Sequence, residues 1–201
     1  MEIYSLENKY IFLTFALSNN LELQNTMKKI AAFAGSTSST SINKQLVIFT
    51  STLLNNTDST IIDMNDHQAV IYSSDEEQKG FPDNLVAFSK QLKEYDGFII
   101  SLAEHNGSYA AAFKNTLDWL SRIDRVIFNN KPVLLMSASP GGRGGASVLA
   151  SASTYFPHAG ASEITSFSFP NFYDNFKDGK VVHQDLLDEL KSRVEEFQGN
   201  L

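Results

Sequence analysis

Short apolar runs alternate along this chain with longer segments in which apolar residues recur at helical spacing. The run Gly97–Leu102 is apolar on both faces, as in the central strand of a parallel sheet. Strands that alternate with helices favour one parallel sheet with helices covering both of its faces. With 201 residues, 42% of them apolar, the chain can form one such domain and is hardly long enough for two.

The alternation predicts the elements in chain order. Strands are expected at Lys29–Ala34, Ser59–Asp63, Gly97–Leu102, Pro132–Ala138 and Glu163–Phe169. Helices are expected at about Ser41–Leu54, Pro82–Lys93, Tyr109–Arg122, from Gly145 to about Phe156, and at Gln184–Phe197. Two polar stretches, Asn65–Gly80 and Asn171–Lys180, lack such a pattern, and the acidic cluster Asp75–Glu77 in the first is interpreted as a solvated loop face.

Three loops follow the first, third and fourth expected strands, at Gly35–Ser41, Ala103–Ser108 and Ser139–Gly145. Adjacent parallel strands end at the same edge of a sheet, so these loops build a single crevice. Doubly wound proteins bind their ligands in that crevice. We therefore expect the functional site at this edge.

The first of these loops has the chemistry of an anion site. Six consecutive hydroxyl residues, Ser36–Ser41, follow the strand and open a helix. The free amides of a first helical turn, the positive end of the helix dipole and several hydroxyls converge there. Because the loop carries no charge of its own, it suits a phosphate held by neutral donors, which indicates a phosphorylated ligand. A serine-rich helix cap without a ligand is the alternative.

Composition and motifs exclude several other functions. The net charge of −7 argues against nucleic-acid binding, and the absence of cysteine excludes disulfides, thiolate metal sites and cysteine nucleophiles. The four histidines are far apart, so no metal site is predicted. The chain has neither a G-x-S-x-G elbow nor a phosphate-binding G-x-x-x-x-G-K-[ST] run. No segment has the ~18 apolar residues that span a bilayer, and a cysteine-free chain fits the cytoplasm.

Three motifs resemble those of the NADPH-dependent FMN reductases of flavodoxin-like fold, a group with azoreductase-like, quinone reductase-like and chromate reductase-like enzymes. They read GSTSSTSIN, AEHNGSYAAAFKNTLDWLSR and SASPGGRGG, and they keep the family's order and spacing. The resemblance covers about Lys28–Phe156, and its second motif is the most specific. It implies an α/β, flavodoxin-like three-layer sandwich whose five-stranded parallel sheet has the order 2-1-3-4-5 and helices on both faces.

The resemblance also implies the chemistry. Noncovalent FMN would pass two electrons from NADPH or NADH to a quinone, azo or flavin-type acceptor. Because the cofactor carries that chemistry, no catalytic side chain is predicted. Relatives assemble as dimers or tetramers, so a homodimer or homotetramer is implied. In the helix of the second motif, we expect Lys114 to pair with Asp118 and Trp119 to pack in the core or an interface.

Cofactor contacts are carried over from the three loops of the family. The predicted cofactor-binding residues are Gly35, Ser36, Ser38, Ser41, Ile42, Asn43, Glu104, His105, Asn106, Gly107, Ser108, Ser139, Gly141 and Gly142. Ser38 stands where the family usually has arginine, which removes a charged phosphate ligand. Ala103 and Ala110 replace prolines, and His105 replaces a tyrosine. His105 would face the ring edge or the substrate, or remain a solvated loop residue. Arg143 would meet an NADPH phosphate or remain a solvated loop charge.

Two other functions stay open at this point. One is an electron carrier of the flavodoxin type without NAD(P)H oxidation, which an NADPH consumption assay would distinguish. The other is a flavin-free regulatory relative, which a flavin titration would identify.

The chain is divided into residues 1–26 and a flavodoxin-like FMN-binding domain at 27–201. Met27 is followed by two lysines and the first expected strand, which is how such a domain would begin. We interpret the preceding residues as an extension, disordered or not part of the domain, that an upstream start codon would add. The alternative is an extra strand or helix that packs on the domain.

Overall fold

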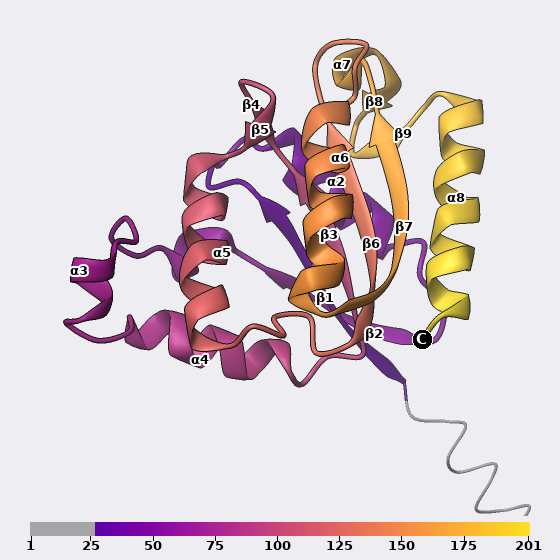
Figure 1. The fold of residues 1–201 in the computed structure, drawn as a ribbon. Helices are drawn as coiled ribbons and strands as arrows, with labels where there is room; N and C mark the ends of the chain where they lie inside the picture. The colour runs from indigo at the N-terminus through magenta and orange to yellow at the C-terminus, as the bar shows by residue number, and fades with distance from the viewer. Residues whose placement is uncertain (1–26) are drawn as a thin grey trace, which may run out of the picture.

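The computed structural model describes residues 27–201, so both interpretations of residues 1–26 lie outside the described part of the chain. Its centre is a five-stranded sheet in the order β2-β1-β3-β6-β7 (Figure 1). The strands are β1 (Lys28–Gly35), β2 (Thr57–Ile62), β3 (Gly97–Leu102), β6 (Lys131–Ala138) and β7 (Ala161–Phe169). All neighbours are parallel, which confirms the predicted sheet and its order.

Helices cover both faces of this sheet and complete three layers (Figure 1). On one face lie α2 (Ile42–Ser51) and α8 (Gln184–Gly199), and on the other lie α4 (Asp83–Leu92), α5 (Ala111–Ile123) and α6 (Ala146–Tyr155). Successive side chains of β1 point to opposite faces of the sheet. Ala31 and Phe33 pack on the face covered by α4, α5 and α6, whereas Ile30 and Ala32 pack on the face covered by α2 and α8. Such two-sided burial is why the three central strands, β1, β3 and β6, are apolar on both faces.

The polar stretches contain more structure than the sequence indicated. After β2 come a 3₁₀ turn, η1 (Met64–His67), and the short helix α3 (Ser74–Glu77). The loop after β3 is a small hairpin of β4 (Glu104–His105) and β5 (Ser108–Tyr109). A second 3₁₀ turn, η2 (Phe156–Ala159), follows α6, and the chain after β7 forms α7 (Phe172–Asn175) and a hairpin of β8 (Phe176–Lys177) and β9 (Lys180–Val181).

The interpretation of Asp75–Glu77 as a loop was wrong, although Asp75 is exposed and Glu76 and Glu77 are partly exposed, as expected of a solvated face. These residues form α3, whose N-cap Ser73 accepts a hydrogen bond from the amide of Glu76. The carboxylate of Glu77 accepts hydrogen bonds from the guanidinium of Arg122 at 3.0–3.2 Å and from the phenol of Tyr72 at 2.7 Å. The sequence could not indicate this ion pair because its partner lies 45 positions away, on α5.

Side chains of α5 form hydrogen bonds with the segment before α3 and hold it against the helix. Asn115 donates to the carbonyls of Ala69 and Val70 and accepts from the amide of Tyr72, and the indole of Trp119 donates to Val70 O at 2.8 Å. Trp119 is 1% exposed, so the predicted packing role is confirmed. The predicted pair is present as well, since Lys114 Nζ lies 2.5 Å from Asp118 Oδ1.

Among the described residues, no helix combines the length and the apolar composition needed to cross a membrane.

Candidate cofactor-binding site

A cavity of about 360 Å³ opens where β1, β3 and β6 end. It is lined by Ser36, Ser38, Thr40, Ser41, Ile42, Asn43, Ala103, Glu104, His105, Ala138, Ser139, Pro140 and Tyr173. The volume lies within the range of small-molecule sites in proteins. All three loops predicted from the sequence contribute to it, at the edge of the sheet where they were expected.

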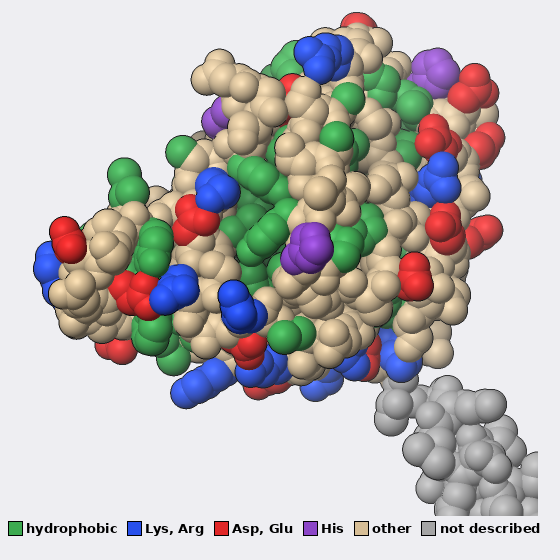
Figure 2. Space-filling model, viewed as in Figure 1, with side chains coloured by type: hydrophobic (Ala, Val, Ile, Leu, Met, Phe, Trp, Pro, Cys, Tyr) green, Lys and Arg blue, Asp and Glu red, His purple; other side chains and the backbone are tan. Residues whose placement is uncertain are grey.

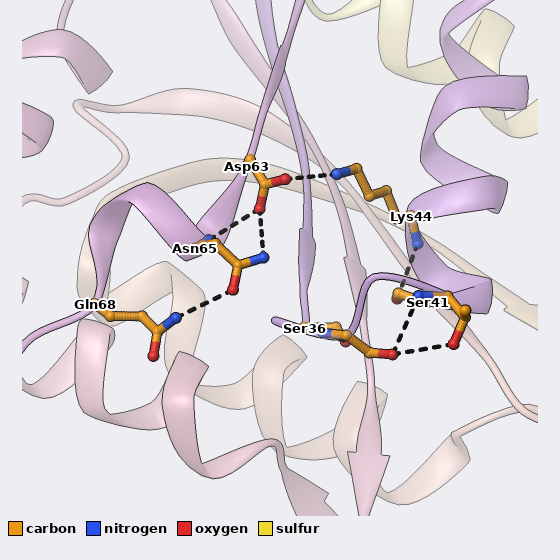
Figure 3. Close-up of polar contacts among 8 residues, drawn as sticks. Ser36, Ser41, Lys44, Asp63, Asn65 and Gln68 are labelled. Atoms are coloured by element: carbon orange, nitrogen blue, oxygen red, sulfur yellow. Dashed lines mark hydrogen bonds and ion pairs between the residues drawn. The ribbon is translucent and has the colours of Figure 1, made fainter.

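The first loop presents hydroxyl groups that its own backbone supports. Ser36 Oγ accepts a hydrogen bond from the amide of Ser38, and Ser38 Oγ accepts one from the amide of Thr40, both at 3.3 Å. An accepting hydroxyl oxygen keeps its own hydrogen. Ser38 Oγ and Thr40 Oγ1 lie 3.3 Å apart and one donates to the other, so the hydroxyls of Ser36 and of the accepting partner remain able to donate to a bound anion. The side chain of Ser41 caps α2 by accepting from the amide of Lys44 at 3.2 Å (Figure 3).

The side chain of Lys44, in the first turn of α2, points away from this loop (Figure 3). The ammonium of Lys44 lies 2.6 Å from Asp63 Oδ2, at the end of β2 (Figure 3). This hydrogen bond, together with those from the amide and side chain of Asn65, lowers the pKa of Asp63 to about 2. The described residues that line the cavity include no lysine or arginine. Its anion-binding capacity therefore depends on neutral donors and on the first turn of α2.

Asn43 ties three elements together behind the cavity. Its side chain is buried at 3% exposure and exchanges two hydrogen bonds with the backbone of Ala138: Nδ2 donates to the carbonyl at 3.3 Å and Oδ1 accepts from the amide at 2.8 Å. Oδ1 also accepts from the hydroxyl of Ser101 at 2.7 Å. The side chain of Asn43 thus holds the start of α2 against the ends of β3 and β6.

Glu104 joins the second loop to the third. Gly145, the N-cap of α6, has no side chain that could cap the helix. Oε2 of Glu104 instead accepts hydrogen bonds from the amides of Ser147 and Val148 at 2.9 and 3.0 Å. A carboxylate at a helix N-terminus is also stabilised by the helix dipole. Glu104 therefore fixes the start of α6 beside the cavity.

The turn at the tip of the second loop does not line the cavity. Asn106 and Gly107 form the turn between β4 and β5 with φ values of +52° and +77°, the left-handed geometry that an Asn-Gly hairpin turn adopts. Both residues are exposed, as are His105, which lines the cavity, and Ser108, which does not. This hairpin places His105 at the rim.

Gly35 is predicted as a cofactor contact, but it does not line the cavity. A Cβ atom at this position would come within 2.9 Å of Leu102 Cδ2 and 3.0 Å of Phe113 Cγ. The end of β1 therefore requires glycine for packing.

The third loop is held by backbone hydrogen bonds from the chain after β7. The amide of Asn171 donates to Gly141 O and the amide of Phe172 donates to Ser139 O, both at 3.0 Å. Gly141 and Gly142 are exposed and do not line the cavity. Arg143 is also exposed and donates to Ser147 Oγ at 2.8 Å.

The predicted residues therefore divide into two groups. Those that line the cavity are Ser36, Ser38, Ser41, Ile42, Asn43, Glu104, His105 and Ser139, and those that do not are Gly35, Asn106, Gly107, Ser108, Gly141 and Gly142. Sequence reasoning included Thr40 among the hydroxyls of the first loop, but it missed Ala103, Ala138, Pro140 and Tyr173 as lining residues. Ala103, Ala138 and Pro140 lie in or beside the predicted loops and would have been found by taking whole loops. Tyr173 lies far along the chain, and no pattern indicated it.

Residues 28–174 match the sequence model of a protein family described as NADPH-dependent FMN reductase. A quinone reductase of Escherichia coli K12 is 38% identical over 77 residues, which are 38% of this chain and 41% of that protein. A 2-hydroxy-1,4-benzoquinone reductase of a Burkholderia species is 33% identical over 117 residues, or 58% of this chain and 63% of that protein. The matched parts thus span less than two thirds of either relative.

The fold has counterparts among solved structures. A flavoenzyme NAD(P)H:(acceptor) oxidoreductase from Paracoccus denitrificans superposes with a TM-score of 0.69 over 87% of this chain and 97% of that chain. The two sequences are 22% identical, so this likeness concerns the fold.

Proposed function

The chain belongs to the NADPH-dependent FMN reductase family, and from this premise we propose that it is an FMN-dependent oxidoreductase that transfers two electrons from NAD(P)H to a quinone, azo or flavin-type acceptor. The observation that carries the proposal is the cavity in which the hydroxyl loop, the first turn of α2 and the two other loops meet. Bound FMN would supply the two-electron carrier between the nicotinamide and the acceptor.

The chemistry of the cavity supports this cofactor. Ser36, Ser38 and Thr40 offer hydroxyl donors next to the start of α2, and this set suits a phosphate monoester. The remaining lining residues of the second and third loops are mostly small, which leaves room for a planar ring. In the proposal the first loop holds the phosphate, while Ala103–His105 and Ala138–Ser139 lie along the ring.

Two of the lining residues, Asn43 and Glu104, would act by holding the elements around the cavity in position. Asn43 fixes the ends of β3 and β6, and Glu104 fixes the start of α6. His105 is exposed at the rim of the cavity, where it could contact the incoming nicotinamide or the electron acceptor. No side chain is proposed as a proton donor. The relatives named as quinone and benzoquinone reductases favour a quinone as acceptor.

We propose further that the protein is a homodimer or homotetramer that assembles through the face of α5 and α6. Hydrophobic side chains gather on this face (Figure 2), and a second cavity of about 420 Å³ lies there. Tyr109, one of its lining residues, has a buried phenol without a partner in the part of the chain that the structure describes, and burial raises the pKa of this phenol to about 12. In sedimentation the wild type should run as an oligomer, and Ser151→Arg, at an exposed position of this cavity, should run as a monomer. A monomeric wild type would contradict the proposal.

The function is tested with purified protein. It should carry or take up FMN, show flavin absorption, and oxidise NADPH or NADH only when FMN is present. Turnover over a panel of quinones, azo dyes and free flavins then identifies the acceptor class. FMN binding without nicotinamide oxidation would indicate an electron carrier, and a colourless protein that ignores added FMN would overturn the proposal. A location in the cytoplasm is part of the same proposal and is tested by cell fractionation.

A further inference from the structure

The cavity has one wall that none of the three loops supplies. After β7 the chain does not run directly into α8 but makes an excursion, residues 170–182, that contains α7 and the β8–β9 hairpin. Tyr173 of α7 lines the cavity together with the hydroxyl loop. Figure 1 shows α7 and β8 beyond the end of β7, at the edge of the sheet where β6 also ends.

Packing fixes the position of Tyr173. Its neighbour Phe172 is 2% exposed and stacks on Phe176 with ring centroids 4.7 Å apart, and it also contacts Phe169 edge-on. The backbone of Asn171 and Phe172 is hydrogen-bonded to the third loop, as described above. The side chain of Asn175 donates to the carbonyl of Pro170 at 2.9 Å and closes the turn. Tyr173 is therefore held at the cavity by a well-packed anchor.

The side chain of Tyr173 is less tightly packed, and its ring lies edge-on to that of Phe172 with centroids 5.7 Å apart. It is 61% exposed, which makes it one of the most exposed large apolar residues of the described chain. The other residues that line the cavity are mainly serine, threonine and alanine, and none of them is a phenylalanine, tyrosine or tryptophan. A tyrosine combines a flat apolar ring with a phenolic donor, and sites for aromatic ligands commonly use such side chains.

We propose that Tyr173 contacts the bound mononucleotide, so that the excursion at residues 170–182 forms part of the cofactor site. This inference rests on the proposed function. The ring of Tyr173 would cover the ligand on a side that the small residues leave open, and burial of that ring would tighten binding. The anchor at Phe172 makes the contact pre-organised, because little freedom of the backbone is lost on binding.

The test is a titration of the apoprotein with FMN, in which the quenching of flavin fluorescence measures binding. This measurement needs no enzyme activity. The wild type should bind FMN. Tyr173→Ala should bind about tenfold more weakly and leave the bound flavin more fluorescent. Val182→Ala is the matched control, because Val182 is 54% exposed, lies in the same excursion and does not line the cavity; its affinity should be that of the wild type.

The phenylalanine variant separates the ring from the phenol. Tyr173→Phe should stay within about threefold of the wild type if the ring makes the contact, and should match Tyr173→Ala if the phenol does. Either result supports the proposal when the thermal melting of all variants is unchanged. Equal FMN affinity of the wild type and Tyr173→Ala would overturn the inference alone. A wild type that binds no FMN would overturn the proposed function and this inference together.

Discussion

Glu104 caps a helix that begins 42 positions later in the chain, because its Oε2 accepts a hydrogen bond from the amide of Ser147 at 2.9 Å, one residue inside α6. The amide of Val148 donates to the same oxygen at 3.0 Å. The cap links the hairpin on one side of the cavity to the glycine-rich loop on the other. The contribution of this link to stability can be tested.

Replacing Glu104 should destabilise the start of α6. Glu104→Ala leaves two helix amides without their acceptor, so the free energy of unfolding should fall by about 1–2 kcal/mol. Glu104→Gln keeps an acceptor oxygen but loses the charge, and it should lose less than the alanine variant. Urea unfolding measures both. If the alanine variant is as stable as the wild type, the cap contributes nothing.

Asn43 should matter more to the fold than its place in the first loop indicates. Asn43→Ala would remove the acceptor that Ala138 N and Ser101 Oγ share in a buried position, so we expect a loss of about 2 kcal/mol. FMN binding should also be weaker in this variant, because the ends of β3 and β6 lose the side chain that hydrogen-bonds to both. Asn200→Ala, at the exposed end of α8, is the control and should stay within about 0.5 kcal/mol of the wild type. An Asn43→Ala protein as stable as the wild type would contradict this prediction.

Acid should destabilise the protein through His67. Its imidazole stacks on the ring of Phe88 with ring centroids 3.8 Å apart, and its Nδ1 is buried without a hydrogen-bond partner in the described chain. Desolvation lowers the pKa of His67 below its usual 6.5, although Asp66 and Asp63 act in the opposite direction. The unfolded chain therefore takes up a proton below pH 6.5 that the folded chain does not, and stability falls as the pH drops through that range.

The variant His67→Phe tests this assignment. It keeps an aromatic ring on Phe88 and removes the proton site, so part of the decrease in melting temperature between pH 7 and pH 5 should disappear. Melting curves of the two proteins across this range provide the measurement. Identical pH profiles would mean that other groups cause the decrease.

Restoring a charge in the first loop should strengthen FMN binding. Ser38 is exposed, lines the cavity and stands where the family usually has arginine. Ser38→Arg should raise the affinity for FMN by about tenfold or more, because a guanidinium bonds a phosphate more strongly than a hydroxyl does. The gain should shrink at high salt.

Two controls accompany the arginine variant. Ser39→Arg places the same charge one residue away, at an exposed position that does not line the cavity, and it should gain much less. Riboflavin lacks the phosphate, so its affinity should be unchanged by either substitution. An equal gain for both variants would indicate a general charge effect and no specific contact at position 38.

The three central strands could be predicted because they are short apolar runs buried on both faces, whereas the edge strands β2 and β7 are partly exposed. The structure places β3 at Gly97–Leu102, as predicted, and the other strands within two residues at each end. The hairpin at Glu104–Tyr109 was not predicted: strands of two residues carry no periodic pattern, and the one local signal, the turn dipeptide Asn106-Gly107, was not used.

Long-range contacts explain what else the sequence did not reveal about the site. The loops predicted the cavity, but whether a loop residue faces it depends on the packing of distant segments. Gly35 faces Leu102 and Phe113, whereas Tyr173 reaches the cavity only because Phe172 is buried beneath the excursion. Neither fact has a local signal in the chain.

The central claim is that neutral donors after β1 bind the phosphate of FMN. It is tested most directly by titrating the wild-type apoprotein in parallel with FMN and with riboflavin, which differ only in that phosphate. Several hydrogen bonds to a charged group should make FMN bind at least about 100-fold more tightly. Equal affinities for the two flavins, or binding of neither, would contradict the account.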